Sequence, residues 1–187
     1  MWCLLDEVVR SCGIIFCMKF IQVNGPSCGG KSTIVKRILE EKPRYYKVSY
    51  DALKWGFSQY KADEHFDDVR ALVRALAEAV CKIEYNIVCD SGMHLKTREK
   101  LFEIARRYNY EIVEINLEAE YDVLRERFEK RLADSAVNPE KRISNTSQTR
   151  HRELFDIYNT EKNPDAYTFH TDTQSEDEIV EQVLKLI

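Results

Sequence analysis

The sequence predicts an α/β fold of three layers, in which helices cover both faces of a five-stranded parallel sheet. Short apolar runs alternate with stretches whose apolar residues recur every three or four positions, which is typical of alternating strands and helices. Such alternation favours right-handed βαβ units, and these build a parallel sheet. A glycine-rich turn follows the first apolar run, at the edge of the sheet where these folds bind ligands. The chain has 187 residues, enough for one domain with its own core.

The first half of the chain is expected to contain three strands and two helices. The first and third strands are short apolar runs, typical of strands buried on both faces. The first helix ends before Pro43, because proline cannot continue a helix. The second helix has one apolar face, formed by Val69, Leu72, Val73, Leu76, Val80 and Ile83. In chain order the elements are strand Lys19–Asn24, helix Gly30–Glu41, strand Tyr46–Ser49, helix Glu64–Lys82 and strand Asn86–Cys89.

The second half of the chain is expected to add two strands and four helices. Residues 135–147 are polar and contain Pro139, so they predict a loop between two of the helices. Ser175, with Glu178 three residues later, fits the capping box that begins a helix. In chain order the elements are helix Thr97–Tyr108, strand Glu111–Asn116, helices Tyr121–Asp134 and Thr149–Tyr158, strand Ala166–His170 and helix Ser175–Leu186.

The turn between the first strand and the first helix fits the P-loop pattern G-x-x-x-x-G-K-[ST], through Gly25, Gly30, Lys31 and Ser32. The glycines let successive backbone N–H groups converge on phosphate oxygens, and the helix that follows adds the positive end of its dipole. Lys31 is expected to reach the β- and γ-phosphates, and the Ser32 hydroxyl to ligate Mg²⁺. The alternative is a glycine-rich turn without a ligand. The expected nucleotide-binding residues are Gly25, Pro26, Ser27, Cys28, Gly29, Gly30, Lys31, Ser32 and Thr33.

Two aspartates are expected on the same edge of the sheet as the P-loop. Asp90 ends an apolar strand, where a carboxylate of a P-loop protein meets Mg²⁺; the alternative is a cap of the next turn. Asp51 ends the second strand, where a carboxylate can orient an acceptor hydroxyl and take its proton. The alternative for Asp51 is an ordinary turn residue. Together with Lys31, Asp51 is a candidate catalytic residue.

Arg127 and Arg131 lie four residues apart on one expected helix, so they project from one face. A closing arginine can stabilise the negative charge that phosphoryl transfer spreads over the equatorial oxygens. Spacing alone equally allows a basic face paired with the glutamates at positions 120, 126 and 129.

Several further residues follow Asp51 or precede the last strand. Trp55, Phe57 and Tyr60 are a candidate stacking platform for a ring, although aromatic residues near a helix start more often belong to a core. Lys54, one helical turn after Asp51, is a candidate contact for an anionic part of the acceptor, with a solvated lysine as the default expectation. Spacing demands no role for His94, Arg142, Arg150 and Arg152.

As a set, these motifs resemble the small P-loop kinases of the polynucleotide-kinase and zeta-toxin group, to which chloramphenicol phosphotransferase is also similar. The resemblance covers Lys19–Ile187 and implies the P-loop NTPase fold with a helical lid at about residues 121–158. It implies Asp51 as general base and Arg127 and Arg131 as lid residues that grip the phosphates. It rests on Gly25–Thr33, Val48-Ser49-Tyr50-Asp51, Asn86–Asp90, Glu126–Arg131 and Asp172-Thr173. Lys54 departs from the Asp-x-x-Arg of that group, because lysine lacks the bidentate fork of arginine.

The expected function is that of an ATP-dependent phosphotransferase with ATP and Mg²⁺ as cofactors. It would move the γ-phosphate to an acceptor hydroxyl, as a polynucleotide 5′-hydroxyl kinase or a related small-molecule kinase does. The alternative is a non-catalytic or regulatory nucleotide-binding protein. A guanine-nucleotide switch is disfavoured because residues 161–165 do not fit Asn-Lys-x-Asp. An AAA+-type motor is disfavoured because the chain is short and Ser91, not glutamate, follows Asp90.

Composition limits the partners. The formal net charge of −4 gives no bulk attraction to nucleic acid, although a local basic groove remains compatible with it. No apolar run approaches the roughly 20 residues that a membrane span needs. Six cysteines without a CxxC pair predict reduced thiols and a cytoplasmic protein. Residues 1–17 do not fit a secretory signal and are expected to be an extension before a kinase domain at 18–187.

Overall fold

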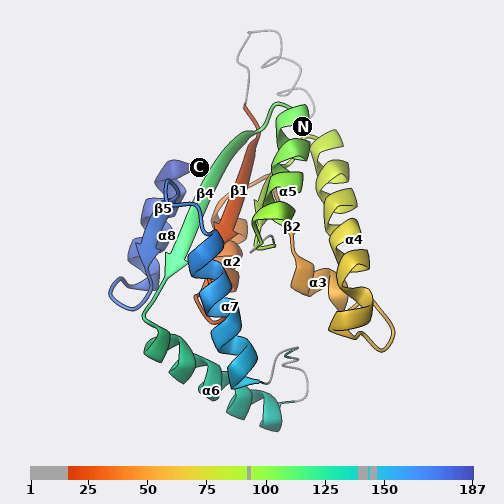
Figure 1. The fold of residues 1–187 in the computed structure, drawn as a ribbon. Helices are drawn as coiled ribbons and strands as arrows, with labels where there is room; N and C mark the ends of the chain where they lie inside the picture. The colour runs from red at the N-terminus through yellow and green to blue at the C-terminus, as the bar shows by residue number, and fades with distance from the viewer. Residues whose placement is uncertain (1–16, 92–93, 139–142, 144–146) are drawn as a thin grey trace, which may run out of the picture.

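The computed structural model describes residues 17–91, 94–138, 143 and 147–187 and confirms the predicted fold class (Figure 1). Five strands form one sheet in the order β2-β3-β1-β4-β5, and every neighbouring pair is parallel. The central strand therefore delivers the P-loop to the middle of the carboxyl edge. The strands are β1 (Lys19–Asn24), β2 (Tyr45–Val48), β3 (Asn86–Cys89), β4 (Glu111–Glu118) and β5 (Tyr167–His170).

Helices cover both faces of the sheet. α2 (Lys31–Glu41) and α8 (Glu176–Leu186) pack on one face, and α4 (Ala62–Lys82) and α5 (Leu95–Arg107) pack on the other. The short helix α3 (Tyr50–Lys54) directly follows β2. Figure 1 shows α6 and α7 beyond the arrowheads of β1 and β4, where a lid would lie. Their bounds are Tyr121–Val137 and Gln148–Glu161.

The side chains of β1 alternate between the two cores, as strand geometry requires. Phe20 packs in the cluster beneath α4 and α5, whereas Ile21 and Val23 pack beneath α2 and α8. Gln22 and Asn24 share the face of Phe20 by this alternation and are both buried. Polar side chains thus lie on the α5 side of the sheet, beside the point where the P-loop begins.

Three details of the predicted elements were wrong. Leu72 and Ile83 were expected in the core, but they are 45 % and 60 % exposed, because the buried stripe of α4 is narrow and includes Ala77 instead. α6 continues through residue 137, into the predicted loop. Asp51 lies in the first turn of α3 and not at the end of β2, because Ser49 begins a helix there.

Residues 1–16, which make up nearly all of the predicted extension, lie outside the described residues.

The predicted capping box of α8 is present. Ser175 Oγ accepts from the Glu178 backbone N–H at 3.3 Å, and the Ser175 N–H donates to Glu178 Oε2 at 2.8 Å. We expect Ser175→Ala to lower the free energy of unfolding by about 1 kcal/mol, because it leaves a backbone donor of the first turn without its partner. Urea unfolding measures this change, and an unaltered midpoint would contradict it.

No helix in the described ranges has the length and hydropathy that crossing a membrane requires.

Candidate active site

The P-loop has the close backbone packing that its glycines allow. A Cβ on Gly25 would lie 2.8 Å from the Leu117 carbonyl oxygen, so the loop passes directly over the end of β4. Gly30 has a φ of 87° and forms the N-cap of α2, a conformation that L side chains rarely adopt. The Lys31 ammonium is held by the loop itself, through donated bonds to the carbonyls of Gly25 at 2.7 Å and Pro26 at 2.8 Å.

We expect Gly25→Ala to weaken nucleotide binding by about tenfold or more, since the new methyl group forces the loop away from Leu117 and misplaces its N–H donors. Calorimetric titration with ATP measures this loss, and a parallel melting curve separates it from global unfolding. Unchanged ATP affinity in a folded variant would contradict the prediction.

The surroundings of Lys31 show which predicted residues converge. Burial lowers the pKa of the Lys31 ammonium, and the negative charges of Asp90 and Asp51 oppose that change. The positive charge of Arg131 lowers the pKa further. Both predicted carboxylates and one predicted lid arginine therefore lie within electrostatic reach of the P-loop lysine.

Asp51 is positioned by the start of α3. Ser49 Oγ caps this helix by accepting from the Ala52 N–H at 3.4 Å, and the Tyr50 N–H donates to Ser91 Oγ. The second bond ties α3 to the residue after Asp90, which brings the two carboxylates to one cavity. The expectation of a solvated Lys54 was wrong: the residue is 5 % exposed, and its ammonium pairs with the Asp51 carboxylate.

Ser32 and Asp90 fit a Mg²⁺ site of the P-loop type. Both line the same cavity, and they supply a hydroxyl and a carboxylate, the hard oxygen ligands that Mg²⁺ prefers. Asp90 Oδ2 lies 3.4 Å from Lys47 Nζ, so the carboxylate is already paired with a cation. Among the described residues no cluster of three or more His, Cys, Asp or Glu side chains could hold a metal. A sparse protein ligand set suits Mg²⁺, which keeps waters and binds substrate phosphates.

Aromatic packing joins the helices α6 and α7 to each other. The Phe128 and His151 rings stack at 4.4 Å, and Tyr121 and Phe155 lie 5.1 Å apart. His151 is buried, and this burial lowers its pKa, while the backbone of Ser27 acts in the opposite direction. A neutral imidazole of α7 thus lies against the nucleotide-binding loop.

The two predicted lid arginines have different surroundings. Arg131 lines the cavity beside the P-loop. Arg127 donates to Thr171 Oγ1 at 2.9 Å and to the Thr171 carbonyl at 2.6 Å. Thr171 in turn lies beside Gly30. In this arrangement Arg127 fastens α6 to the turn after β5, next to the P-loop.

A cavity of about 490 Å³ opens between the P-loop, α3, α4 and the α6–α7 pair. Its lining includes Ser27, Lys31 and Ser32 of the P-loop region and the aromatic residues Trp55 and Tyr60. The cavity is also lined by His94 and Arg150, to which spacing gave no role.

Phe57 lies outside the cavity and packs on His65 at 5.1 Å, whereas Arg152 pairs with Asp156 at 3.2 Å. Arg142 lies outside the described residues.

Sequence reasoning missed two residues of α4 that line this cavity, Phe66 and Arg70. Phe66 and Arg70 lie four residues apart, and each lies three residues before a buried valine of α4, Val69 or Val73. That spacing is the signal that identifies them, because it places both on the face that continues the stripe.

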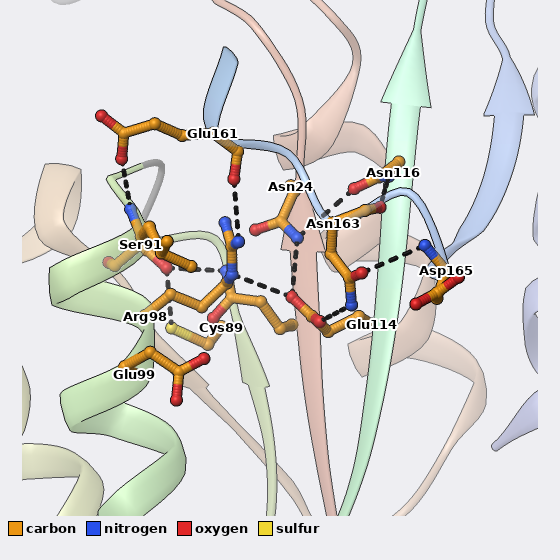
Figure 2. Close-up of polar contacts among 12 residues, drawn as sticks. Asn24, Cys89, Ser91, Arg98, Glu99, Glu114, Asn116, Glu161, Asn163 and Asp165 are labelled. Atoms are coloured by element: carbon orange, nitrogen blue, oxygen red, sulfur yellow. Dashed lines mark hydrogen bonds and ion pairs between the residues drawn. The ribbon is translucent and has the colours of Figure 1, made fainter. Parts of the chain in front are cut away.

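A buried polar network lies beside the P-loop on the α5 side of the sheet (Figure 2). Arg98 is 2 % exposed, and its Nε lies 3.0 Å from Glu114 Oε1. The same guanidinium donates to the Glu161 carbonyl at 2.9 Å. Asn24, which directly precedes Gly25, donates to Glu114 Oε1 at 3.3 Å. The network therefore connects the last residue before the P-loop with α5, β4 and the end of α7.

The segment after α7 completes this network. Asn163 donates to the Glu114 carboxylate, and its carbonyl accepts from Asn116 Nδ2 at 2.8 Å. The Glu161 carboxylate accepts from the Leu95 N–H at the start of α5 (Figure 2). The residues that fail to match a guanine-reading motif thus fasten the lid helix to the body of the domain.

Comparison with known proteins agrees with this geometry. Residues 20–154 match the model of a family described as an AAA domain, which spans more than half of the chain. No curated protein sequence matches the chain.

Several of the solved structures with a similar fold are described as kinases. A candidate kinase from Chloroflexus aurantiacus has a TM-score of 0.69 at 18 % identity, over 91 % of this chain and 98 % of its own. The Mycobacterium tuberculosis APS kinase, solved with AMPPNP and APS, has a TM-score of 0.64 at 19 % identity, over 91 % and 97 %. A gluconokinase from Sinorhizobium meliloti has a TM-score of 0.59 at 21 % identity, over 89 % and 90 %. At these identities the likeness establishes the fold alone and leaves the activity and the substrate open.

Proposed function

The chain belongs to the AAA-domain family, and from this membership and the site geometry we propose that it is an ATP-dependent phosphotransferase with an alcohol as acceptor. The observation that carries the proposal is the shared cavity: Lys31, Asp51 and Asp90 line one chamber at the carboxyl edge of the sheet. Membership of this family does not by itself make the protein an AAA+-type motor. Such a motor is expected to carry glutamate after the aspartate that ends the strand, whereas Ser91 follows Asp90 here and accepts from the Tyr50 N–H.

In the proposed reaction the acceptor oxygen attacks the γ-phosphorus of ATP. The new O–P bond forms as the bond from the γ-phosphorus to the β,γ-bridging oxygen breaks, and ADP leaves. The acceptor proton passes to the Asp51 carboxylate, which lines the same cavity as the P-loop lysine. The P-loop N–H groups and Lys31 hold the phosphates in place.

The remaining site residues take supporting roles in this proposal. Bound Mg²⁺ would neutralise phosphate charge, and Ser32 and Asp90 are the residues that would hold it. Arg131 is the lid arginine placed to contact the transferring group, since it lines the cavity. Arg127, the second predicted phosphate contact, would have to leave Thr171 to reach a phosphate. The free thiols among the described residues, Cys17, Cys28, Cys81 and Cys89, support the proposal of a cytoplasmic location.

An acceptor screen with γ-labelled ATP tests the function. The screen contains nucleosides, nucleotides, sugars, aminoglycosides and 5′-hydroxyl DNA and RNA ends. We expect stoichiometric transfer of label to at least one alcohol, faster than release of inorganic phosphate. ATP binding with only slow hydrolysis across the whole screen would instead support the alternative of a non-catalytic nucleotide-binding protein.

A further inference from the structure

Part of the cavity lining is aromatic and cationic, and we call this part of the lining the ring chamber. It consists of Tyr50, Trp55, Tyr60 and Phe66 together with the cations of Lys54 and Arg70. The whole cavity of about 490 Å³, P-loop part included, has the size of a small-molecule site. The space left beside the phosphates therefore suits a compact acceptor.

The aromatic side chains form the walls of the ring chamber in two contacting pairs. Tyr50 and Phe66 lie 5.9 Å apart at an interplanar angle of 57°, and Trp55 and Tyr60 lie 5.8 Å apart at 71°. Both are tilted or edge-on contacts, which are common between packed aromatic rings. All four rings also line the cavity, so a planar group bound there would gain stacking contact with one of them.

Each cation of the ring chamber lies against one of these rings. The Arg70 guanidinium carbon is 3.9 Å from the Phe66 ring centroid, and the Lys54 ammonium is 4.9 Å from that of Trp55. Arg70 is also 3.7 Å from Asp67, whose side chain is 94 % exposed, so this carboxylate screens it weakly. A ligand that carries both a ring and an acidic group would contact a wall and a cation at once.

The hydroxyl groups of the ring chamber are already engaged. The Tyr50 and Tyr60 hydroxyls are bonded to each other at 3.0 Å, and Ser91 Oγ accepts from the Tyr50 N–H. Asn and Gln are absent from the described lining of the cavity. Few neutral hydrogen-bonding groups of the ring chamber thus remain for the many hydroxyls of a sugar. A polycationic aminoglycoside would meet Lys54 and Arg70.

We propose that the acceptor is a compact alcohol that carries a planar ring and an acidic group, such as a mononucleotide or an aromatic hydroxy acid. This inference rests on the proposed phosphotransferase function and assigns its substrate class. The ring lies among Tyr50, Trp55, Tyr60 and Phe66, the acid contacts Arg70, and the hydroxyl faces Asp51. The phosphoryl group moves from ATP to that hydroxyl and the proton to Asp51, as in the reaction above.

The test compares matched acceptors with γ-labelled ATP. A nucleoside 3′-monophosphate and an aromatic hydroxy acid carry ring and acid, the nucleoside carries only the ring, and a sugar phosphate carries only the acid. We expect kcat/KM for at least one of the first two to exceed that of the others by about tenfold or more. Preference for a sugar, an aminoglycoside or a long 5′-hydroxyl oligonucleotide would overturn the inference and leave the phosphotransferase proposal intact. Transfer to no alcohol would overturn both.

Two variants test which side chain contacts the acid of the acceptor and which contacts its ring. Arg70→Gln is expected to raise KM about tenfold for the acidic acceptor while leaving KM for ATP and for the nucleoside unchanged. Arg74→Gln, one turn further along α4 and outside the cavity lining, is the matched control and should change neither value. Quenching of Trp55 fluorescence by the preferred acceptor gives a binding readout that needs no turnover, and Trp55→Phe removes it. Equal effects of the two arginine variants, or no quenching, would contradict the assignment.

Discussion

Asp51→Asn is expected to lower the rate of phosphoryl transfer by a factor of about 10² to 10⁴ with nearly unchanged ATP affinity. The amide keeps the shape of the side chain but cannot take the proton of the acceptor hydroxyl. The expected nucleotide contacts come from the P-loop and not from Asp51, so we expect ATP to bind without this carboxylate. Single-turnover transfer measures the loss, and calorimetric titration measures the ATP affinity.

Two comparisons make this result specific to Asp51. Asp68→Asn, on the exposed face of α4, is the matched control and should retain full activity. Because Asp51→Asn removes the carboxylate that pairs with the buried Lys54 ammonium, a melting curve is needed to show that the variant is folded. Full transfer activity in folded Asp51→Asn would refute the general-base assignment.

Arg98→Met is expected to lower the free energy of unfolding by about 3–5 kcal/mol, the largest stability effect predicted for this protein. Removing the guanidinium leaves Glu114, whose side chain is only 11 % exposed, as a buried charge with weaker compensation. It also leaves the Glu161 carbonyl without its donor, which loosens the end of α7. Denaturant unfolding measures the change.

A surface arginine on the same helix provides the control. Arg106 has a 59 % exposed side chain and lies 3.5 Å from Glu99, so Arg106→Met should cost less than about 1 kcal/mol. The double variant Arg98→Met, Glu114→Gln should regain part of the lost stability, because it removes the second charge and keeps an amide oxygen as acceptor for Asn24 and Asn163. Equal losses of unfolding free energy in the two single arginine variants would show that the buried Arg98–Glu114 pair stabilises the protein no more than the exposed Arg106–Glu99 pair.

Local patterns predicted most of the fold. β1 and β3 have the predicted bounds, and the capping box of α8 is present as Ser175 and Glu178 indicated. These elements depend on features that neighbouring residues carry: apolar runs, helical spacing and a cap. The P-loop belongs to the same class, since its function comes from backbone geometry that the glycines themselves allow.

Sequence patterns did not predict the burial of charged residues whose neighbours come from distant segments of the chain. In the sequence, Arg98 resembles the other charged residues of its helix, which are expected to be exposed. It is buried because Glu114 of β4 and the end of α7 surround it. Lys54 reads as solvated, yet Asp51 and the Trp55 ring hold it in the site. Burial of a charged side chain is decided by the partners that the fold packs around it, and spacing carries no information about them.

The candidate site divides along the same line. The sequence by itself indicated that the P-loop motif, Asp51 and Asp90 meet at one edge of a parallel sheet, because each follows a predicted strand and the carboxyl ends of parallel strands share one edge. Only the tertiary structure decided what lies across from them. It brought Phe66 and Arg70 of α4 to the rings after Asp51, placed Arg131 at the cavity, and bound Arg127 to Thr171. Side chains on different helices become neighbours only when those helices pack on the sheet, and that packing is a property of the whole chain.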